Sequence, residues 1–232
     1  MTCAQAAPAT ATPVAAPTGA VVLTGGTGYL GTHLAERLLA RGHRVRLLVR
    51  SAAAGRAATG AEVIIGNALD SESIATALQP GDTLVHLVGT AHPNPAKAAE
   101  FEAVDLASIR AAASAASRTA ITHLVYVSVA QPAPVMRAYL AARAAGEAAV
   151  AVSGVRATIL RPWYVVGPGH RWPIILTPLY ALAACVPRWH PAAERLGLVS
   201  LEQMTQALVR AVEKPPASAI EIVDVPGIRA AA

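Results

Sequence analysis

The sequence predicts an α/β fold, a doubly wound parallel sheet with helices on both faces, and three observations support this expectation. Short apolar runs rich in β-branched residues alternate with longer amphipathic runs, as in a parallel sheet covered by helices. The length of 232 residues suits one such domain. A composition that is 54% hydrophobic and 14% charged provides a large core and a thinly charged surface.

The first half of the chain is expected to alternate strands and helices from residue 20 onward. Leucines at positions 30, 34 and 38 recur at helical spacing and predict a first helix, which Gly42 ends. Asp70 or Ser71 is expected to cap the helix after the third strand. The expected strands are residues 20–24, 44–49, 62–65 and 83–88.

The second half continues this alternation as far as a sixth strand. Helices are expected at residues 96–117 and 135–152, and strands at 121–128 and 155–160. After Arg161 the alternation weakens. Ser200 is expected to cap a late helix that ends near Glu213, and a last strand is expected at 220–225.

Two stretches near the ends of the predicted domain lack charged side chains. Residues 1–19 are rich in Ala, Pro and Thr, and three prolines interrupt any apolar run, so we expect a disordered tail and no secretory signal. Residues 172–187 form a stretch shorter than the roughly 20 residues of a membrane span, and Pro173 and Pro178 interrupt it. We therefore expect one cytoplasmic domain at 20–232, without a transmembrane segment.

Charge and cysteine content exclude several classes of partner. The net charge is +5, but no basic run is interleaved with aromatic residues, so we expect no nucleic-acid partner. Cys3 and Cys185 provide neither a disulfide framework nor the Cys/His spacing of a zinc site, and we expect no metal.

A glycine-rich turn between the first strand and the first helix is the strongest motif. Gly25 permits a tight turn, Gly28 lets a pyrophosphate approach the backbone, and Gly31 lets the helix pack closely. The N–H groups at the helix start then face the phosphates. This predicts a Rossmann-type dinucleotide site, and the alternative is a glycine-rich turn without a ligand. The other expected contacts within the turn are Thr27, Tyr29 and Leu30.

The end of the second strand bears on the choice of cofactor. An NAD site of this kind usually has an acidic residue there, which binds the ribose 2′-hydroxyl. The chain has Arg50, with Arg56 nearby, and these suit a 2′-phosphate. We therefore expect NADP in preference to NAD; the alternative is an ordinary solvated arginine.

The sequence resembles the short-chain dehydrogenase/reductase superfamily, in its extended or atypical branch, over most of residues 20–225. More narrowly, it is similar to NAD(P)-binding, epimerase/dehydratase-like proteins akin to the dehydrogenase-like accessory subunit of respiratory complex I. The resemblance rests on TGGTGYLG at 24–31, GNALD at 66–70, LVYVS at 124–128, Tyr139 with Glu147, and LRPWYVVGPG at 160–169.

The resemblance implies further cofactor contacts. The family usually has Asp at position 67, where it binds the adenine amino group, and the amide oxygen of Asn67 can accept the same hydrogen bond. Ala68 follows it. The resemblance also places Val88 and Gly89 beside the adenosine half of the cofactor and Pro162 near the nicotinamide.

The resemblance also points to a catalytic set. Active members use Tyr-x-x-x-Lys, in which Tyr is the acid/base and the charge of Lys favours the tyrosinate. Here Tyr139 is followed by Arg143, which keeps the charge with a different shape. Alternatively, Glu147 one turn further on pairs with Arg143 and makes it structural. Ser128 matches the first serine of the family's Ser-Ser pair, and Val129 stands at the second, which is often the catalytic one.

Residues 163–200 are expected to form a small C-terminal substrate lobe. The aromatic residues Trp163, Trp172, Tyr180 and Trp189 lie in an apolar setting there. Such a lining suits a hydrophobic substrate, for example an isoprenoid, a quinone or a lipid-like carbonyl compound. It equally suits a dimer face, a peripheral membrane contact or an ordinary core helix.

Two functions are consistent with these residues. The first is an NADP-dependent oxidoreductase or epimerase/dehydratase-like enzyme, with Tyr139, Arg143 and Ser128 as catalytic candidates and an apolar carbonyl or alcohol as substrate. The second is a non-catalytic NADP(H)-binding protein that senses redox state or stabilises a complex. The altered Lys and Ser positions favour the second, and Tyr139 with Glu147 favours the first. Either would be a monomer or a homodimer.

Overall fold

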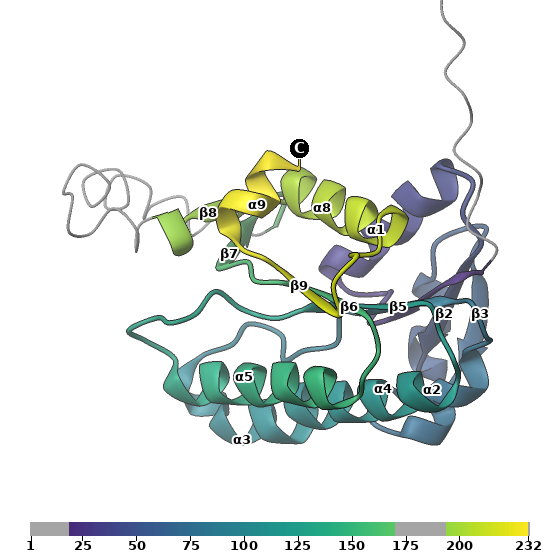
Figure 1. The fold of residues 1–232 in the computed structure, drawn as a ribbon, viewed down its shortest axis with the longest axis horizontal. Coiled ribbons are helices and arrows are strands. Elements are labelled where there is room, and N and C mark those ends of the chain that lie inside the picture. The colour runs from purple at the N-terminus through teal and green to yellow at the C-terminus, as the bar shows by residue number, and fades with distance from the viewer. Residues whose placement is uncertain (1–18, 170–193, 232) are drawn as a thin grey trace, which may run out of the picture.

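The computed structural model describes residues 19–169 and 194–231, which build a seven-stranded sheet (Figure 1). All strands are parallel, in the order β3-β2-β1-β4-β5-β6-β9, which confirms the predicted doubly wound fold. The strands are β1 (Val21–Thr24), β2 (Val45–Val49), β3 (Glu62–Ile65), β4 (Thr83–His86), β5 (His123–Val127), β6 (Ala157–Leu160) and β9 (Ile220–Val223).

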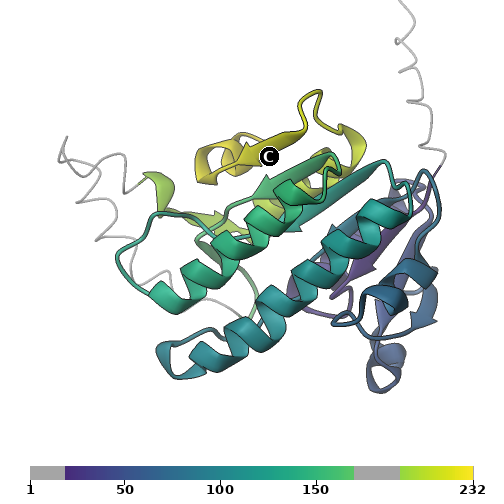
Figure 2. The ribbon, with the colours of Figure 1, turned by 60° about the horizontal axis from the view of Figure 1, so that its bottom comes forward.

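Helices cover both faces of this sheet. On one face lie α1 (Tyr29–Ala40), α8 (Leu201–Glu213) and α9 (Val225–Ala230) (Figure 1). On the other face lie α2 (Ser71–Ala77), α4 (Ala107–Arg118) and α5 (Arg137–Val152), with α4 and α5 side by side (Figure 2). Within the described ranges, no helix has both the length and the apolar character that a membrane crossing requires.

Local side-chain chemistry sets several helix boundaries where the sequence placed them. Asp70 caps α2, because its carboxylate accepts the N–H groups of Glu72 and Ser73. Ser200 and Gln203 form a reciprocal capping box at the start of α8, which ends at Glu213 as expected.

Other elements differ from the sequence prediction. The helix expected at 96–117 runs from Pro95 to Arg118 but is divided into η2 (Pro95–Lys97), α3 (Ala98–Glu100), the π-helical turn η3 (Phe101–Leu106) and α4. The short elements η1 (Ser51–Arg56), β7 (Tyr164–Val166), β8 (Leu198–Ser200) and α9 were not predicted. Elements of three to six residues carry too few positions to show a periodicity.

Parts of the predicted chain organisation lie outside the described residues. These are the tail at 1–18 with Cys3, and most of the 163–200 lobe, including Trp172, Tyr180, Cys185 and Trp189. The described part of the lobe contains β7 and β8, which pair with each other in parallel.

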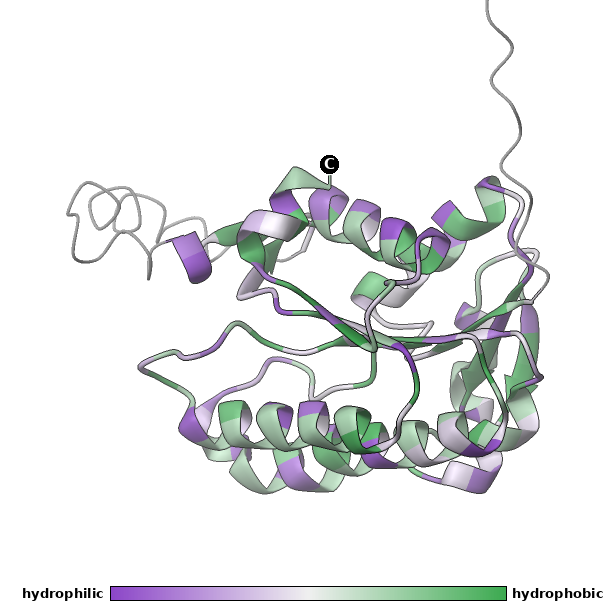
Figure 3. Ribbon diagram, viewed as in Figure 1, coloured by the Kyte–Doolittle hydropathy of each residue, from purple (hydrophilic) through white to green (hydrophobic). Residues whose placement is uncertain are grey.

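Two hydrophobic clusters, one on each face of the sheet, form the core. Leu34 and Leu38 of α1 pack with α8 on one face, and Ile109 of α4 packs on the other. Each fully buried side chain of this size contributes roughly 1.5–3 kcal/mol. Helix α8 alternates hydrophobic and hydrophilic positions around its axis (Figure 3), as a helix buried on one side requires.

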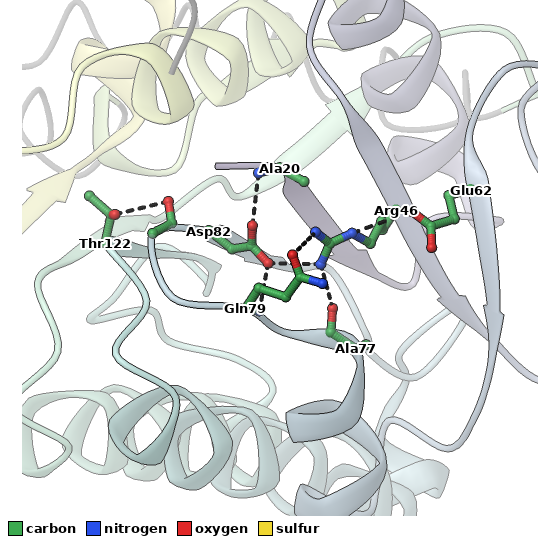
Figure 4. Close-up of polar contacts among 8 residues, drawn as sticks. Ala20, Arg46, Glu62, Ala77, Gln79, Asp82 and Thr122 are labelled. Carbon is green, nitrogen blue, oxygen red and sulfur yellow. Dashed lines mark hydrogen bonds and ion pairs between the residues drawn. The ribbon is translucent and has the colours of Figure 1, made fainter. Parts of the chain in front are cut away.

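A buried ion pair joins the amino ends of the strands, opposite the edge at which the strands end (Figure 4). Asp82 accepts hydrogen bonds from the N–H of Ala20 at 2.8 Å, from Arg46 at 2.8 Å and from the N–H of Gln79 at 2.7 Å. Arg46 also donates to the carbonyl of Ala77. Asp82 is 1% exposed and Arg46 6%, so the network fixes the starts of β1, β2 and β4 in a nearly dry environment.

Replacing Asp82 with Ala is expected to lower the free energy of unfolding by about 3–5 kcal/mol, because the buried guanidinium of Arg46 keeps only the exposed Glu62, at 3.4 Å, as an ion-pair partner. Urea unfolding measures this loss. As a control, Glu72→Ala removes the partner of Arg118 in an exposed ion pair and is expected to change stability by less than about 1 kcal/mol. Equal losses in the two variants would show that burial does not strengthen the Asp82 pair.

Candidate functional site

A cleft of about 330 Å³ opens at the carboxyl edge of the sheet, where the strand order reverses between β1 and β4. Its walls are the glycine-rich turn after β1, the loop after β4 and the residues that follow β5 and β6. Tyr139 and Arg143 of α5 complete it. Ser128 after β5 also lines it, so the structure brings the predicted turn and all three predicted catalytic residues into one cavity.

The glycine-rich turn has a shape that side chains would prevent. Gly25 has φ +79°, and a Cβ there would lie 2.9 Å from the carbonyl carbon of Leu87. A Cβ on Gly31 would lie 2.3 Å from the carbonyl oxygen of Gly25. Gly28 is the N-cap of α1 and provides no side-chain cap. The first turn of α1 therefore presents backbone N–H groups at the cleft, as a phosphate site requires.

The three other predicted contacts in the turn differ in their position relative to the cleft. Tyr29 and Leu30 line the cleft, whereas Thr27 is half-buried beside it. Burial raises the pKa of Tyr29, whose hydroxyl lies where a Cβ on Gly167 would be only 2.3 Å away. Tyr29 thus packs the turn against the segment after β7.

The residues expected around the adenosine half lie at the same edge of the sheet. Arg50 follows β2 and is exposed, and within the described residues its side chain forms no ion pair. Asn67 follows β3, and its amide oxygen accepts the N–H of Leu69 at 3.0 Å. A carbonyl oxygen has two lone pairs, so one acceptor position of Asn67 is left for a ligand. Ala68 and Val88 are half-buried nearby, while Gly89 and Pro162 line the cleft itself.

Arg143 is buried and pairs with a residue that the sequence analysis did not identify. Its Nη2 lies 2.6 Å from Oδ1 of Asp105, and its Nη1 donates to the carbonyl of Val127 at 2.9 Å. The alternative pairing of Arg143 with Glu147 was therefore wrong. Burial favours the neutral guanidine, but the neighbouring tyrosines and Asp105 outweigh it and raise the pKa of Arg143, so the group stays charged.

Glu147 instead forms hydrogen bonds with residues that follow β5 and β6. It accepts hydrogen bonds from Ser128 Oγ at 2.5 Å, from Gln131 at 2.9 Å and from Arg161 Nε at 3.0 Å. It also forms an ion pair with Arg161. Since the Ser128 hydroxyl is engaged by Glu147 and the residue is 3% exposed, this geometry favours a structural role for Ser128.

Tyr139 has the exposure expected of a cleft residue. Its ring packs on Phe101 with 5.0 Å between ring centroids, and the guanidinium carbon of Arg143 lies 5.1 Å from its ring centre. Among the described residues, the Tyr139 hydroxyl forms no hydrogen bond. The phenol is therefore half-buried, close to a cation, and has its hydroxyl available.

A buried histidine lies beneath the cleft. His86 Nδ1 is 2.8 Å from Thr24 Oγ1, its register neighbour on β1, and Nε2 is 3.1 Å from Ser108 Oγ. Burial, with a smaller effect of the Arg143 charge, lowers the pKa of His86 to about 3. The ring is thus neutral and structural at physiological pH.

The sequence does contain a signal for Asp105. Phe101, Asp105 and Ile109 recur every four residues, so the aspartate stands on the buried face of an alanine-rich helix. A carboxylate on such a face needs a buried partner. That partner is distant in sequence, and no local pattern indicates which residue it is.

Comparison with known proteins is consistent with this geometry. A family model described as NAD(P)H-binding matches residues 25–171, more than half of the chain. The chain belongs to this NAD(P)H-binding family. It has the Rossmann-type fold of the short-chain dehydrogenase/reductase and epimerase superfamily. The narrower likeness to an accessory subunit of respiratory complex I stays a prediction.

The relatives of this NAD(P)H-binding chain include reductases. It is 28% identical over 209 residues to the ceramide reductase of Caulobacter vibrioides, covering 89% of this chain and 65% of that protein. It is 35% identical over 108 residues to 4-hydroxy-2-methyl-3-oxo-4-farnesyl-3,4-dihydroquinoline-1-oxide ketoreductase of Stigmatella aurantiaca. That match covers 46% of this chain and 32% of the ketoreductase. The chain thus spans less than two thirds of the length of either relative.

Among solved structures, the NAD(P)H-binding chain is similar to UDP-glucuronic acid 4-epimerase from Bacillus cereus in complex with NAD. The TM-score is 0.65 at 16% identity, and the match covers 88% of this chain and 76% of that one. At this identity the likeness concerns the fold alone.

The low pKa of His86 predicts an acid-sensitive fold. In the unfolded chain His86 takes up a proton below its ordinary pKa of about 6.5, whereas in the folded chain it does so only below about pH 3. Between these two pH values the unfolded state binds more protons than the folded state, so the free energy of unfolding decreases as the pH is lowered. Between pH 7 and pH 4 His86 is expected to contribute about 3 kcal/mol of this loss. Urea unfolding at both pH values should show a correspondingly smaller drop in His86→Gln.

The matched control is His33→Gln on the exposed face of α1, for which we expect the pH dependence of wild type. A drop in His86→Gln as large as that of wild type would show that other groups cause the acid sensitivity. The comparison uses the difference between two pH values, so a uniform loss of stability in the variant does not affect it.

Proposed function

We propose that the chain is an NADP(H)-dependent oxidoreductase that interconverts an apolar carbonyl compound and its alcohol, with Tyr139 as the acid/base. One observation carries this proposal. Tyr139, with an available hydroxyl and a cation 5.1 Å from its ring, stands in the same cleft as the glycine-rich turn.

The cleft fits a nicotinamide dinucleotide. The turn has no room for side chains at Gly25 and Gly31, so the backbone N–H groups at the start of α1 are accessible to a pyrophosphate. Nε of Arg143 is a buried donor without a hydrogen-bond partner among the described residues, and Arg143 lines the cleft. The cation of Arg143 would therefore lie beside the ribose of a bound dinucleotide, while Nε itself is enclosed by protein.

The chemistry divides between the cofactor and the chain. A bound nicotinamide supplies or takes up a hydride. Tyr139 would donate a proton to the carbonyl oxygen in reduction and accept it from the alcohol in oxidation. Arg143 would stabilise the tyrosinate through its charge. With Val129 in place of the second serine, and Ser128 bonded to Glu147, Tyr139 would handle this proton without help from a serine.

Arg50 supports NADP in preference to NAD. It is exposed directly after β2, and its side chain has no protein partner among the described residues. The position lacks the carboxylate that binds a ribose 2′-hydroxyl and offers a cation for a 2′-phosphate.

An apolar substrate is favoured by both the cleft and the relatives. Val129, Trp163 and Val165 line the cleft beside Tyr139. The names of the two curated relatives describe a ceramide and a farnesylated quinoline, which are both lipid-like. We infer a substrate with a long apolar portion next to its carbonyl group.

A second function, non-catalytic NADP(H) binding, is favoured by the pairing of Arg143 with Asp105. A lysine at position 143 would act as a compact cation, whereas two nitrogens of Arg143 are occupied by protein. In that case the cleft binds the dinucleotide and Tyr139 only packs against it.

Tyr139→Phe separates the two functions. If Tyr139 is the acid/base, kcat for NADPH oxidation with a long-chain or farnesylated ketone should fall at least about 100-fold. NADPH affinity should stay within about twofold, because the ring remains. Tyr164→Phe on β7 serves as the control and should keep the wild-type kcat. Turnover by Tyr139→Phe at the wild-type rate would refute the role of the phenol, and NADPH binding without turnover across such ketones would favour the second function.

Arg50→Glu tests the cofactor preference. NADPH affinity should fall at least about tenfold and NADH affinity less than about twofold, because only NADPH carries the 2′-phosphate. Fluorescence titration measures both. Arg110→Glu, an equal charge change on the exposed side of α4, controls for net charge and should alter neither affinity. Equal losses for the two cofactors in Arg50→Glu would contradict the NADP assignment.

A further inference from the structure

Asp105 is a buried carboxylate at the point where two walls of the cleft meet. Its side chain has no exposed surface, and it lies in the π-helical turn η3. Oδ2 accepts hydrogen bonds from both the N–H of Thr90, at 3.0 Å, and its hydroxyl, at 2.6 Å. Oδ1 lies 2.6 Å from Nη2 of Arg143. One side chain therefore links the loop after β4 to helix α5.

The loop and the helix meet with little space between them. A Cβ on Gly89 would lie 2.4 Å from Nη2 of Arg143 and 3.2 Å from Oδ1 of Asp105. Gly89 and Thr90 line the cleft on one side of this contact, and Arg143 lines it on the other. A shift of the Asp105 carboxylate would therefore move both walls.

The chemistry of Asp105 excludes direct binding of the dinucleotide. A buried carboxylate repels phosphates, and both of its oxygens already face protein groups. The 2.6 Å contact of Oδ1 with Arg143 is an ion pair, and Oδ1 forms no hydrogen bond among the described residues. This pair and the carbonyl of Val127 hold the guanidinium in place, with Nε buried and without a hydrogen-bond partner among the described residues.

We propose that Asp105 is a positioning residue that orients Arg143 and the Thr90 loop toward the nicotinamide-ribose half of the dinucleotide. This rests on the proposed NADPH binding. The residue acts through Arg143 and through the Thr90 loop and touches no ligand itself.

The proposal predicts that loss of the Asp105 charge weakens NADPH binding, whereas electrostatics alone predicts stronger binding. Removing a negative charge near an anionic ligand should strengthen binding by Coulomb attraction alone. Loss of positioning should weaken it, because Arg143 and the loop after β4 no longer present a fixed surface. Asp105→Asn keeps the shape of the side chain and separates the two effects.

The experiment measures two ligands on the full chain by calorimetric titration. NADPH spans the whole site, whereas 2′,5′-ADP carries only the adenosine half and its phosphates. Asp105→Asn should lower NADPH affinity about tenfold and leave 2′,5′-ADP affinity within about twofold. In an Arg143→Met background the same change should alter NADPH affinity less than about threefold, since most of the effect passes through Arg143.

Three outcomes would overturn the proposal. NADPH affinity that is unchanged or higher in Asp105→Asn would show that charge alone matters. Equal losses for both ligands would show general disruption of the fold. An undiminished loss in the Arg143→Met background would show that Arg143 is not the intermediary. A wild-type chain that binds neither ligand overturns the proposed function and this inference with it.

Thr90→Val covers the case in which Asp105→Asn does not fold. It removes one donor to Asp105 and leaves the buried charges paired. It should lower NADPH affinity about threefold with no change for 2′,5′-ADP. Wild-type NADPH affinity in Thr90→Val would overturn the role of the Thr90 contact in positioning.

Discussion

The close contact between Gly31 and the carbonyl of Gly25 is the constraint on which the site depends. A Cβ at position 31 would stand 2.3 Å from that oxygen, so α1 can approach the turn only because the side chain is absent. This approach aims the first turn of α1 at the carboxyl edge of β1 and β4. The remaining walls of the cleft then come from whatever follows β4, β5 and β6, since parallel strands end at one edge.

Two buried polar networks stand at opposite edges of this sheet and have different consequences. The Arg46–Asp82 pair joins the starts of the strands, and its hydrogen bonds end on backbone groups such as Ala20 N–H, so it serves the fold. The Arg143–Asp105 pair joins elements that border the cleft and leaves one nitrogen without a protein partner among the described residues. A fully satisfied network favours rigidity. The buried Nε of Arg143 and Oδ1 of Asp105, which lack hydrogen-bond partners among the described residues, mark a less completely bonded contact beside the cleft.

The sequence predicts the parts of this molecule that depend on near neighbours along the chain. Strand β3, the Asp70 cap and the Ser200 cap were placed correctly because each reflects local alternation or capping chemistry. The glycine-rich turn was predicted for the same reason. The partner of Arg143 was assigned wrongly, since helical spacing suggested Glu147 while the fold brings in Asp105 from 38 positions earlier in the sequence. Long-range pairing of this kind depends on the packing of η3 against α5.

The exchange of lysine for arginine in the Tyr-x-x-x-Lys pattern has a physical consequence. Lysine is a compact charge on a flexible stem and needs no support, whereas the planar guanidinium acts well only when its orientation is fixed. Asp105 and the carbonyl of Val127 fix it here, at the expense of two of its nitrogens and with partial neutralisation of its charge. An Arg143 held in this way stabilises a tyrosinate less than an unpaired cation would, because the carboxylate offsets part of its field. In the proposed enzyme, the paired guanidinium would therefore hold its charge in a defined place beside the ribose and would activate Tyr139 less strongly than an unpaired cation.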